Sequence, residues 1–182
     1  MVEDDEIEIQ NVVASATFNQ RLPLDRIAIY LKNTEYEPEQ FPGLVYRLEE
    51  PKAAALLFGS GKVVCTGTKS PEQAKEATHK IIDELTEADV NIDTKPDVTV
   101  QNIVASSQLE ATLNLNRIAF ELVGTEYEPE QFPGLVYRLE EPEVVFLLFS
   151  SGNLVCTGGK TYEDVKKGIS QLEENLEEIG AL

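Results

Sequence analysis

The hydrophobic positions of the chain change period along its length, and each change marks an expected strand or helix. Residues 6–16 are rich in β-branched side chains and partly alternate with polar ones, as a half-buried strand does. A short helix is expected from Pro23 to about Lys32, where apolar residues recur at helical spacing. Three apolar runs divided by turn residues then predict an antiparallel meander. They are residues 44–49, 53–58 and 62–66.

A long amphipathic helix is expected after the meander. Ser70 is a good N-cap, Pro71 suits the first helical position, and Gln73 could close a capping box. Apolar residues at helical spacing carry this helix to about Ala88. Residues 89–97 then contain a candidate short strand and join this part of the chain to the next.

The same plan occurs twice, with a shift of 91 positions in a chain of 182 residues. The eighteen residues 34–51 recur letter for letter as residues 125–142. The rest of the chain aligns at the same shift without a gap, so we expect two repeats, 1–91 and 92–182. Two repeats are too few for a solenoid, and a duplicated domain with a pseudo-twofold axis fits better.

Each repeat reads as strand, short helix, three strands and long helix, which predicts an α+β fold. Joined, the repeats would form one long antiparallel sheet with the long helices on one face. Side chains two apart in a strand share a face, and the set that carries Asn11, Ser15 and Thr66 is the more polar one. We expect that set to face away from the helices. Its other members are Val13, Leu56, Phe58 and Val64, with Asn102, Val104, Leu147, Phe149, Val155 and Thr157 in the second repeat.

Each copy of the repeated segment begins with an acidic loop and ends on an aromatic tip. The tips are Phe41-Pro42-Gly43 and Phe132-Pro133-Gly134. An exposed aromatic ring is costly, and finding it twice indicates either paired contacts with one partner or two halves of one symmetric structure.

The charge of the chain is strongly negative but unevenly placed. With 33 acidic and 15 basic residues the net charge is −18, which taken alone argues against a nucleic-acid partner. Residues 53–67 and 144–158, however, contain no acidic residue. The sheet could therefore be neutral with a basic rim. The basic residues near it are Arg47, Lys52, Lys62, Lys69, Arg138 and Lys160.

Several classes of protein are disfavoured. The sequence has no duplicated nucleophile–base pair, no Gly-rich phosphate loop and no cluster of metal ligands, so we expect neither an enzyme nor a cofactor or metal. It has no apolar run long enough to span a membrane and no signal peptide, so we expect a cytoplasmic protein without a targeting segment. Cys65 and Cys156 lie in apolar strands and read as buried free thiols.

The repeated motifs closely resemble those of the TATA-box-binding proteins of archaeal type. They are QNVVAS and QNIVAS, the paired EPEQFPGLVYRL segments, and LLFGSGKVVCTG and LLFSSGNLVCTG, and the likeness covers residues 7–180. The resemblance implies a saddle, a curved ten-stranded antiparallel sheet with helices on its convex face. It also implies a general transcription initiation factor at the nucleoid that binds the TATA box in the DNA minor groove and kinks it.

The resemblance also implies roles for particular side chains. Phe41, Phe58, Phe132 and Phe149 would wedge between base pairs at the two ends of the site. Asn11, Asn102, Thr66 and Thr157 would reach acceptors at its centre. Val13, Val64, Leu56, Val104, Val155 and Leu147 would form an apolar floor. Arg47, Ser60, Lys62, Arg138 and Ser151 would meet phosphates. Glu128, Glu130 and Gln131 would contact transcription factor B, which brings RNA polymerase.

Plainer interpretations stay open beside this one. Phe58 and Phe149 could be core residues, and Phe41 and Phe132 could tuck under their own loops. The sheet could serve as a protein- or ligand-binding module without DNA specificity. Self-association of the free protein as a homodimer also stays open.

Overall fold

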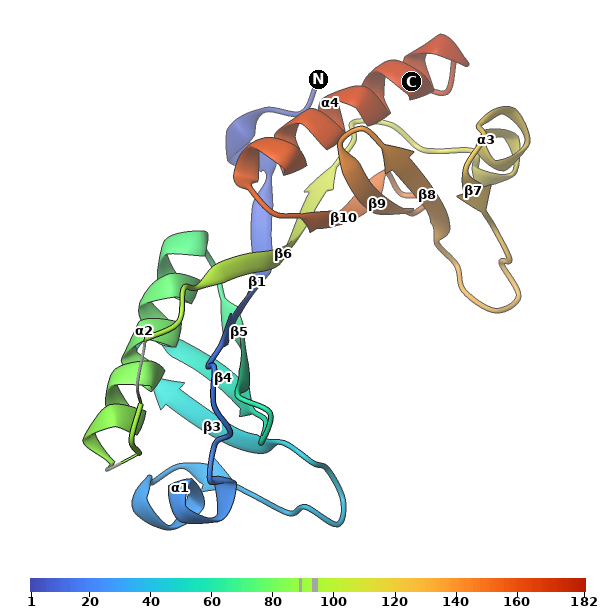
Figure 1. Cartoon of the computed structure of the whole chain (residues 1–182). Coiled ribbons are helices and arrows are strands. Elements are labelled where there is room, and N and C mark those ends of the chain that lie inside the picture. The colour runs from blue at the N-terminus through green and yellow to red at the C-terminus, as the bar shows by residue number, and fades with distance from the viewer. Residues whose placement is uncertain (89, 93–94) are drawn as a thin grey trace. The chain divides into compact units, whose positions relative to one another are not determined.

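The chain divides into two compact units (Figure 1). The computed structural model describes residues 1–88, 90–92 and 95–182. One unit is Asn11–Gln101 and the other combines Met1–Gln10 with Asn102–Leu182. The first ten residues therefore belong to the same unit as the second repeat.

The unit Asn11–Gln101 contains a five-stranded antiparallel sheet in the order β2-β3-β4-β5-β1. The expected meander is confirmed, because β3 pairs with β4 and β4 with β5. In chain order the elements are β1 (Glu8–Thr17), α1 (Leu24–Tyr30), β2 (Thr34–Glu35), β3 (Leu44–Glu49), β4 (Lys52–Leu57), β5 (Lys62–Thr68) and α2 (Pro71–Glu87).

The other unit repeats this order as β6-β10-β9-β8-β7. In this unit a short 3-10 helix, η1 (Asp4–Glu6), precedes residues 8–10, the first residues of β1. The remaining elements are β6 (Thr99–Gln108), α3 (Leu115–Glu121), β7 (Thr125–Glu126), β8 (Leu135–Glu140), β9 (Glu143–Leu148), β10 (Asn153–Gly159) and α4 (Tyr162–Glu178). The expected α+β class is thereby confirmed, with ten antiparallel strands and four α-helices in the residues described.

The structure departs from the expected elements in three places. The strands β2 and β7 lie inside the segment that reads as a loop, because two-residue strands carry no periodicity. The helix η1 also has no sequence counterpart. The short strand expected within 89–97 is absent from residues 90–92 and 95–97, where Pro96 offers no N–H to a ladder, and positions 89, 93 and 94 lie outside the described residues.

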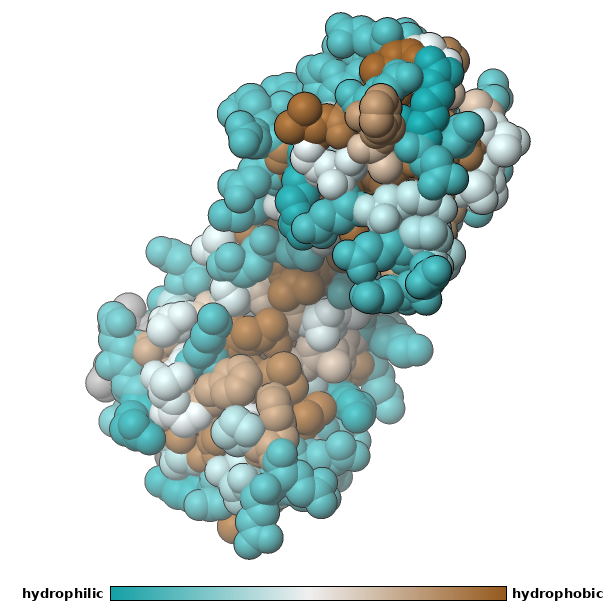
Figure 2. All heavy atoms as spheres, turned by 90° about the vertical axis from the view of Figure 1, so that its right-hand side faces the viewer, coloured by the Kyte–Doolittle hydropathy of each residue, from teal (hydrophilic) through white to brown (hydrophobic). Residues whose placement is uncertain are grey.

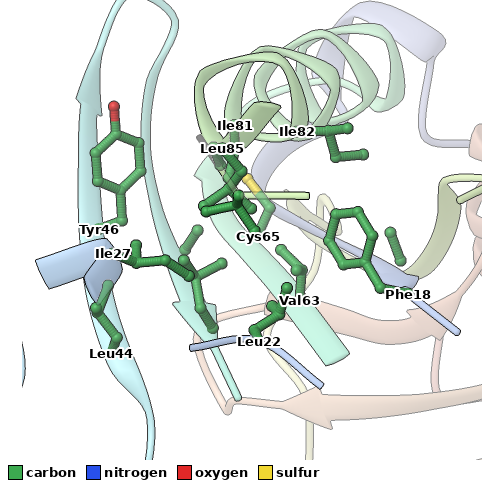
Figure 3. Packing of buried hydrophobic residues seen from close by; sticks show 14 of the residues in the cluster. Phe18, Leu22, Ile27, Leu44, Tyr46, Val63, Cys65, Ile81, Ile82 and Leu85 are labelled. Atoms are coloured by element: carbon green, nitrogen blue, oxygen red, sulfur yellow. The ribbon is translucent and has the colours of Figure 1, made fainter. Parts of the chain in front are cut away.

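Each long helix covers one face of its own sheet. Helix α2 packs on β4 and β5, and α4 packs on β9 and β10 (Figure 1). In the first of these cores, Ile81 and Leu85 of α2 meet Val63 and Cys65 of β5 (Figure 3). All four side chains are fully buried, so hydrophobic burial fixes which face of the sheet is closed.

The two long helices begin with different caps. The Oγ of Ser70 accepts from the N–H of Gln73 at 3.1 Å, as expected for an N-cap. The Gln73 side chain, however, accepts from the N–H of Lys69 rather than closing the expected capping box. A complete box occurs at α4, between Thr161 and Asp164. Hydrogen bonds to this carboxylate hold the pKa of Asp164 below its usual value, although burial opposes the shift.

The first residues of the chain are bound to α4, which explains why they belong to its unit. The N–H of Val2 donates to Glu173 at 2.6 Å. Lys166 pairs with Asp4 at 2.7 Å, and the Tyr162 hydroxyl donates to the carbonyl oxygen of Asp4.

We expect both cysteines to resist thiol reagents in the folded protein. Burial raises the pKa of the Cys156 thiol to about 12. Burial also raises the pKa of Cys65, against the effect of a hydrogen bond with Thr78. The reactive thiolate is therefore scarce at pH 8, and the sulfur atoms are covered. A colorimetric thiol assay should detect almost none in the native protein and two per chain in denaturant; rapid native reaction would contradict this.

Candidate nucleic-acid interface

The uncovered sheet face in the unit Asn11–Gln101 consists of the alternating set expected from the sequence. Leu56 and Val64 pair across β4 and β5, and both are half-buried. Their neighbours Leu57 and Val63 point the other way and are fully buried. Figure 2 shows apolar side chains, in brown, gathered in the lower part of the view and bordered by hydrophilic ones. The expected division into a closed and an open face is therefore confirmed.

The second unit shows the same division of its faces. Leu147 and Val155 pair across β9 and β10 and are half-buried, whereas Leu148 and Leu154 are buried. Val13 and Val104 are also half-buried at equivalent places in β1 and β6. Each unit thus leaves a row of aliphatic side chains uncovered by its helices.

Ser15 is the exception to the expected pattern, because it is only 8% exposed. The Nε2 of Gln101 donates to its hydroxyl at 2.8 Å, so this amide side chain covers it. The equivalent residue, Ser106, is half-buried and accepts from Gln10 at 2.8 Å. Alternation gives the face of a residue but not which neighbouring side chain covers it.

Two further residues belong to the open faces and were missed by the sequence reasoning. Val45 pairs with Leu56, and Val136 pairs with Leu147, and both valines are half-buried. The signal was present, because Leu44 and its alternate neighbours in β3 are buried. Alternation within the LVYRLE strand would have found them.

The expected wedge residues form two matched aromatic pairs. Phe41 and Phe58 pack edge to face with ring centroids 6.0 Å apart, and so do Phe132 and Phe149. Phe41 is 41% exposed and Phe132 is 42% exposed. Phe58 and Phe149 are half-buried at the ends of β4 and β9. Phe58 and Phe149 lie outside the buried core, so the plainer interpretation of these two as core residues is wrong.

The glycine of each Phe-Pro-Gly tip permits this packing. A Cβ on Gly43 would lie 2.8 Å from the ring of Phe41 and 3.0 Å from that of Phe58. A Cβ on Gly134 would lie 2.6 Å from the ring of Phe132 and 3.0 Å from the ring of Phe149. Real Cβ atoms do not approach so closely, so only glycine lets both rings meet above the backbone.

The preceding turn sets the direction of the first ring in each pair. The carbonyl oxygen of Glu37 accepts from the N–H groups of Gln40 and Phe41 at 2.9 and 3.0 Å. Glu128 does the same for Gln131 and Phe132, with the same distances. The side chains of Glu128, Glu130 and Gln131 remain exposed, as do the matching ones of the first loop.

A β-bulge orients the amide of Asn11. The register places two residues, Thr66 and Gly67, opposite the single residue Val13. Gly67 has φ +99°, and its N–H donates to Asn11 Oδ1 at 2.7 Å. The Nδ2 group donates one hydrogen to Thr66 Oγ1 at 2.9 Å, and its second hydrogen remains available as a donor.

The second unit has the same bulge. Thr157 and Gly158 stand opposite Val104, and Gly158 has φ +103°. Its N–H donates to Asn102 Oδ1 at 2.6 Å, and Asn102 Nδ2 donates to Thr157 at 3.0 Å. Both asparagines therefore present the N–H₂ end of the amide rather than the oxygen.

The candidate phosphate contacts are exposed, and some already have partners. Arg47 lies 3.6 Å from Glu35, and Arg138 lies 4.0 Å from Glu126. Exposed ion pairs of this kind contribute little, so these guanidinium groups can be redirected at small cost. Ser60, Lys62 and Ser151 lie exposed at the turns after β4 and β9. The Ser151 hydroxyl accepts from the N–H of Asn153 at 3.3 Å.

Comparisons with known proteins decide the family. The family described as "Transcription factor TFIID (or TATA-binding protein, TBP)" matches residues 6–88 and 97–179. The chain belongs to the TATA-binding protein family. This is a family of transcription factors rather than enzymes, in agreement with the expected absence of catalysis.

Named relatives match along their whole length. A "TATA-box-binding protein" of Picrophilus torridus is 50% identical over all of both chains. That of Haloarcula marismortui is 51% identical over 97% of this chain and 96% of its own. The solved structure titled "Methanococcus jannaschii TBP" has 51% identity and a TM-score of 0.84, and the match covers 95% of this chain and 99% of the other.

Two negative findings apply to the described residues. Within residues 1–88, 90–92 and 95–182, no helix is long and apolar enough to cross a membrane. Across the same residues, no three side chains of the metal-binding kinds lie close enough together to hold an ion.

Proposed function

We propose that the open faces of the two units bind the minor groove of TATA-box DNA and that the phenylalanine pairs wedge between its base pairs. The observation that carries this proposal is the repeated arrangement of an aliphatic row, an oriented amide and an edge-packed phenylalanine pair. TATA-box-binding proteins are the familiar example of minor-groove binding with apolar wedges.

The chemistry of the groove suits such a face. In the minor groove an A·T pair presents only acceptors, whereas a G·C pair adds the guanine amino donor. Asn11 and Asn102 each present a donor, which favours A·T pairs. The aliphatic rows offer no acceptor to a guanine amine, so that amine would lose its water without a partner. Flexible pyrimidine–purine steps, as in TATA, lower the cost of a kink.

The net charge of −18 does not oppose this role, because few of the carboxylates lie on the open faces. Glu35 and Glu126 are among those few, on the short outer strands, where Arg47 and Arg138 pair with them. Strands β4 and β5 contain no acidic residue, and β10 contains none either. Arg47, Lys62 and Arg138, with Ser60 and Ser151, would meet phosphates at the rim. A gel shift with TATA and G·C duplexes would separate this function from that of a sheet-based protein- or ligand-binding module.

The second loop is proposed as the contact for transcription factor B. Glu128, Glu130 and Gln131 are exposed on a turn held by two backbone hydrogen bonds. A fixed acidic turn suits a basic protein surface, and factor B would then bring RNA polymerase to the promoter.

The first prediction tests the aromatic wedges. Gly43→Ala with Gly134→Ala should push each ring pair apart and weaken TATA binding by roughly tenfold, since overpacking a tight contact costs about 1–3 kcal/mol. The DNA bend, measured by energy transfer between dyes at the duplex ends, should also decrease.

Gly59→Ala is the matched control for this prediction. A Cβ there would meet nothing closer than an Arg21 nitrogen at 3.7 Å, and the second repeat already has Ser150 at this position. Wild-type bending by the double glycine variant would show that the ring geometry is not needed.

The second prediction tests the oriented amides. Asn11→Asp with Asn102→Asp keeps the acceptor for the bulge N–H but replaces the donor with a charged acceptor. TATA affinity should fall by roughly tenfold or more for each change, because an unpaired or repelled acceptor costs about 1–3 kcal/mol. Binding to a G·C duplex should change much less in a fluorescence anisotropy titration.

Two variants control for charge. Asn116→Asp adds the same charge on α3, where the first repeat already carries Asp25, and should leave TATA affinity intact. Asn11→Ala with Asn102→Ala should weaken TATA binding less than the aspartates do, but in the same direction. Equal losses on both duplexes would mean that the amides only position the protein.

The third prediction tests the loop contact. Glu128→Lys with Glu130→Lys should abolish the supershift of the protein–DNA complex by factor B while leaving TATA binding intact. The matched control is Glu37→Lys with Glu39→Lys, which makes the same change in an identical loop and should have a much smaller effect. Retention of the supershift by the first variant would refute the proposed partner contact.

A further inference from the structure

The segment proposed to contact factor B cannot itself distinguish the two units. Residues 34–51 and 125–142 are identical, and their turns have the same hydrogen bonds. A partner that prefers one unit must therefore also contact residues outside this segment. The nearest such residues belong to the short helix that precedes each copy.

That helix is fixed against the base of the segment in the same way in both units. In the second unit, Thr125 Oγ1 donates to the carbonyl oxygen of Ala119 at 3.2 Å and to that of Leu122 at 3.0 Å. The N–H of Arg138 donates to the carbonyl oxygen of Gly124 at 3.0 Å. The end of α3 is thus held at a fixed place beside β7, and the acidic loop extends from the other end of that strand (Figure 1).

The first unit has the equivalent bonds. Thr34 Oγ1 donates to the carbonyl oxygens of Ala28 and Leu31 at 3.3 and 3.2 Å, and the N–H of Arg47 donates to that of Asn33 at 3.1 Å. The two helices share these bonds, but α3 is attached in one further way, because Arg117 also donates to the carbonyl oxygens of Ile179 and Gly180 at the end of α4.

Large apolar side chains are exposed on α3 and directly after it. Phe120 is 91% exposed and Val123, just beyond the helix, is 94% exposed. The apolar residues that hold α3 in place, Leu115 and Ile118, are buried. Phe120 and Val123 thus contribute little to the core, and a large exposed aromatic side chain suits an interface better than a solvated surface.

The first unit offers a different surface at the same positions. Ile29 replaces Phe120, Tyr30 replaces Glu121, and exposed Lys32 replaces Val123. Residues 24–52 run from the start of the first short helix to the residue after the repeated segment, and they contain six acidic and four basic residues. The equivalent residues 115–143 contain seven acidic and two basic residues. The second unit is therefore the more acidic one at this site. Both units expose two large hydrophobic side chains there, because Ile29 is 82% and Tyr30 is 57% exposed, but only the first unit also carries Lys32.

We propose that Phe120 and Val123 select the unit on which the basic protein partner docks, with Phe120 as the apolar anchor and Lys32 repelling the same partner from the first unit. This inference rests on the proposed contact between factor B and the acidic loop. The partner surface that fits has basic residues for Glu128 and Glu130 and an apolar recess for the Phe120 ring.

The test exchanges the helix surfaces between the units. One set of changes is Phe120→Ile, Glu121→Tyr and Val123→Lys, and the other is Ile29→Phe, Tyr30→Glu and Lys32→Val. Each new residue already occurs at the equivalent place of the other unit, so folding should be preserved and TATA affinity unchanged. A photoreactive phenylalanine analogue at Pro129 or at Pro38 then reports, by crosslinking to factor B, which loop the partner contacts on TATA DNA.

The wild-type protein should crosslink mainly from position 129. The first set of changes should weaken the supershift at least tenfold, and both sets together should move most crosslinking to position 38. Unchanged crosslinking in the combined variant, with Glu128→Lys and Glu130→Lys still abolishing the supershift, would overturn this inference but not the proposed function. If the variant with Glu128→Lys and Glu130→Lys still gave the supershift, the proposed function itself would be refuted.

Self-association is the competing use of the same surface. Sedimentation of the free protein with and without Phe120→Ile, Glu121→Tyr and Val123→Lys distinguishes the two. An unchanged sedimentation coefficient together with a weaker supershift supports docking of the basic partner. A shift toward monomer with an unchanged supershift would overturn the inference in favour of a second copy of this chain.

Discussion

One-sided packing is the constraint on which the rest of the structure depends. A single long helix closes one face of each five-stranded sheet, and the hydrophobic effect concentrates the largest apolar residues there. The other face is also apolar, and apolar surface in water favours association. The many carboxylates, placed on helices and loops, offset that tendency through repulsion between molecules. Acidity and DNA binding are therefore compatible in this chain.

Backbone irregularities, rather than side-chain identity alone, make the open face specific. An asparagine in a regular strand could present either its oxygen or its N–H₂ group. Here the bulge N–H of Gly67 takes the Asn11 oxygen, and this leaves the nitrogen as the donor. At the rim, Gly43 allows two aromatic rings to share a space that a methyl group would fill. In both places, glycine determines what a neighbouring side chain can present.

The sequence predicted most of the fold, because duplication made each weak signal appear twice. Alternation separated Leu56 from Leu57 correctly, and the paired tips identified Phe41 and Phe132 as exposed. The rest depended on contacts that no periodicity encodes. Ser15 is buried although alternation places it with the open-face residues of β1, and β2 forms because two residues of a loop meet β3. The bulge that turns Asn11 depends on a register shift, which becomes visible only when both strands are placed.

Duplication also explains where asymmetry can arise. The identical segment includes the turn, the aromatic tip and a strand of the sheet, so a change there would alter several contacts at once. The exposed positions Phe120 and Val123, on the preceding short helix and just beyond its end, have no such role, because Leu115, Ile118 and the hydrogen bonds from Arg117 hold the helix in place. Phe120 and Val123 can therefore differ from Ile29 and Lys32 without disturbing the fold. The two nearly equal halves thus differ where the structure tolerates a change.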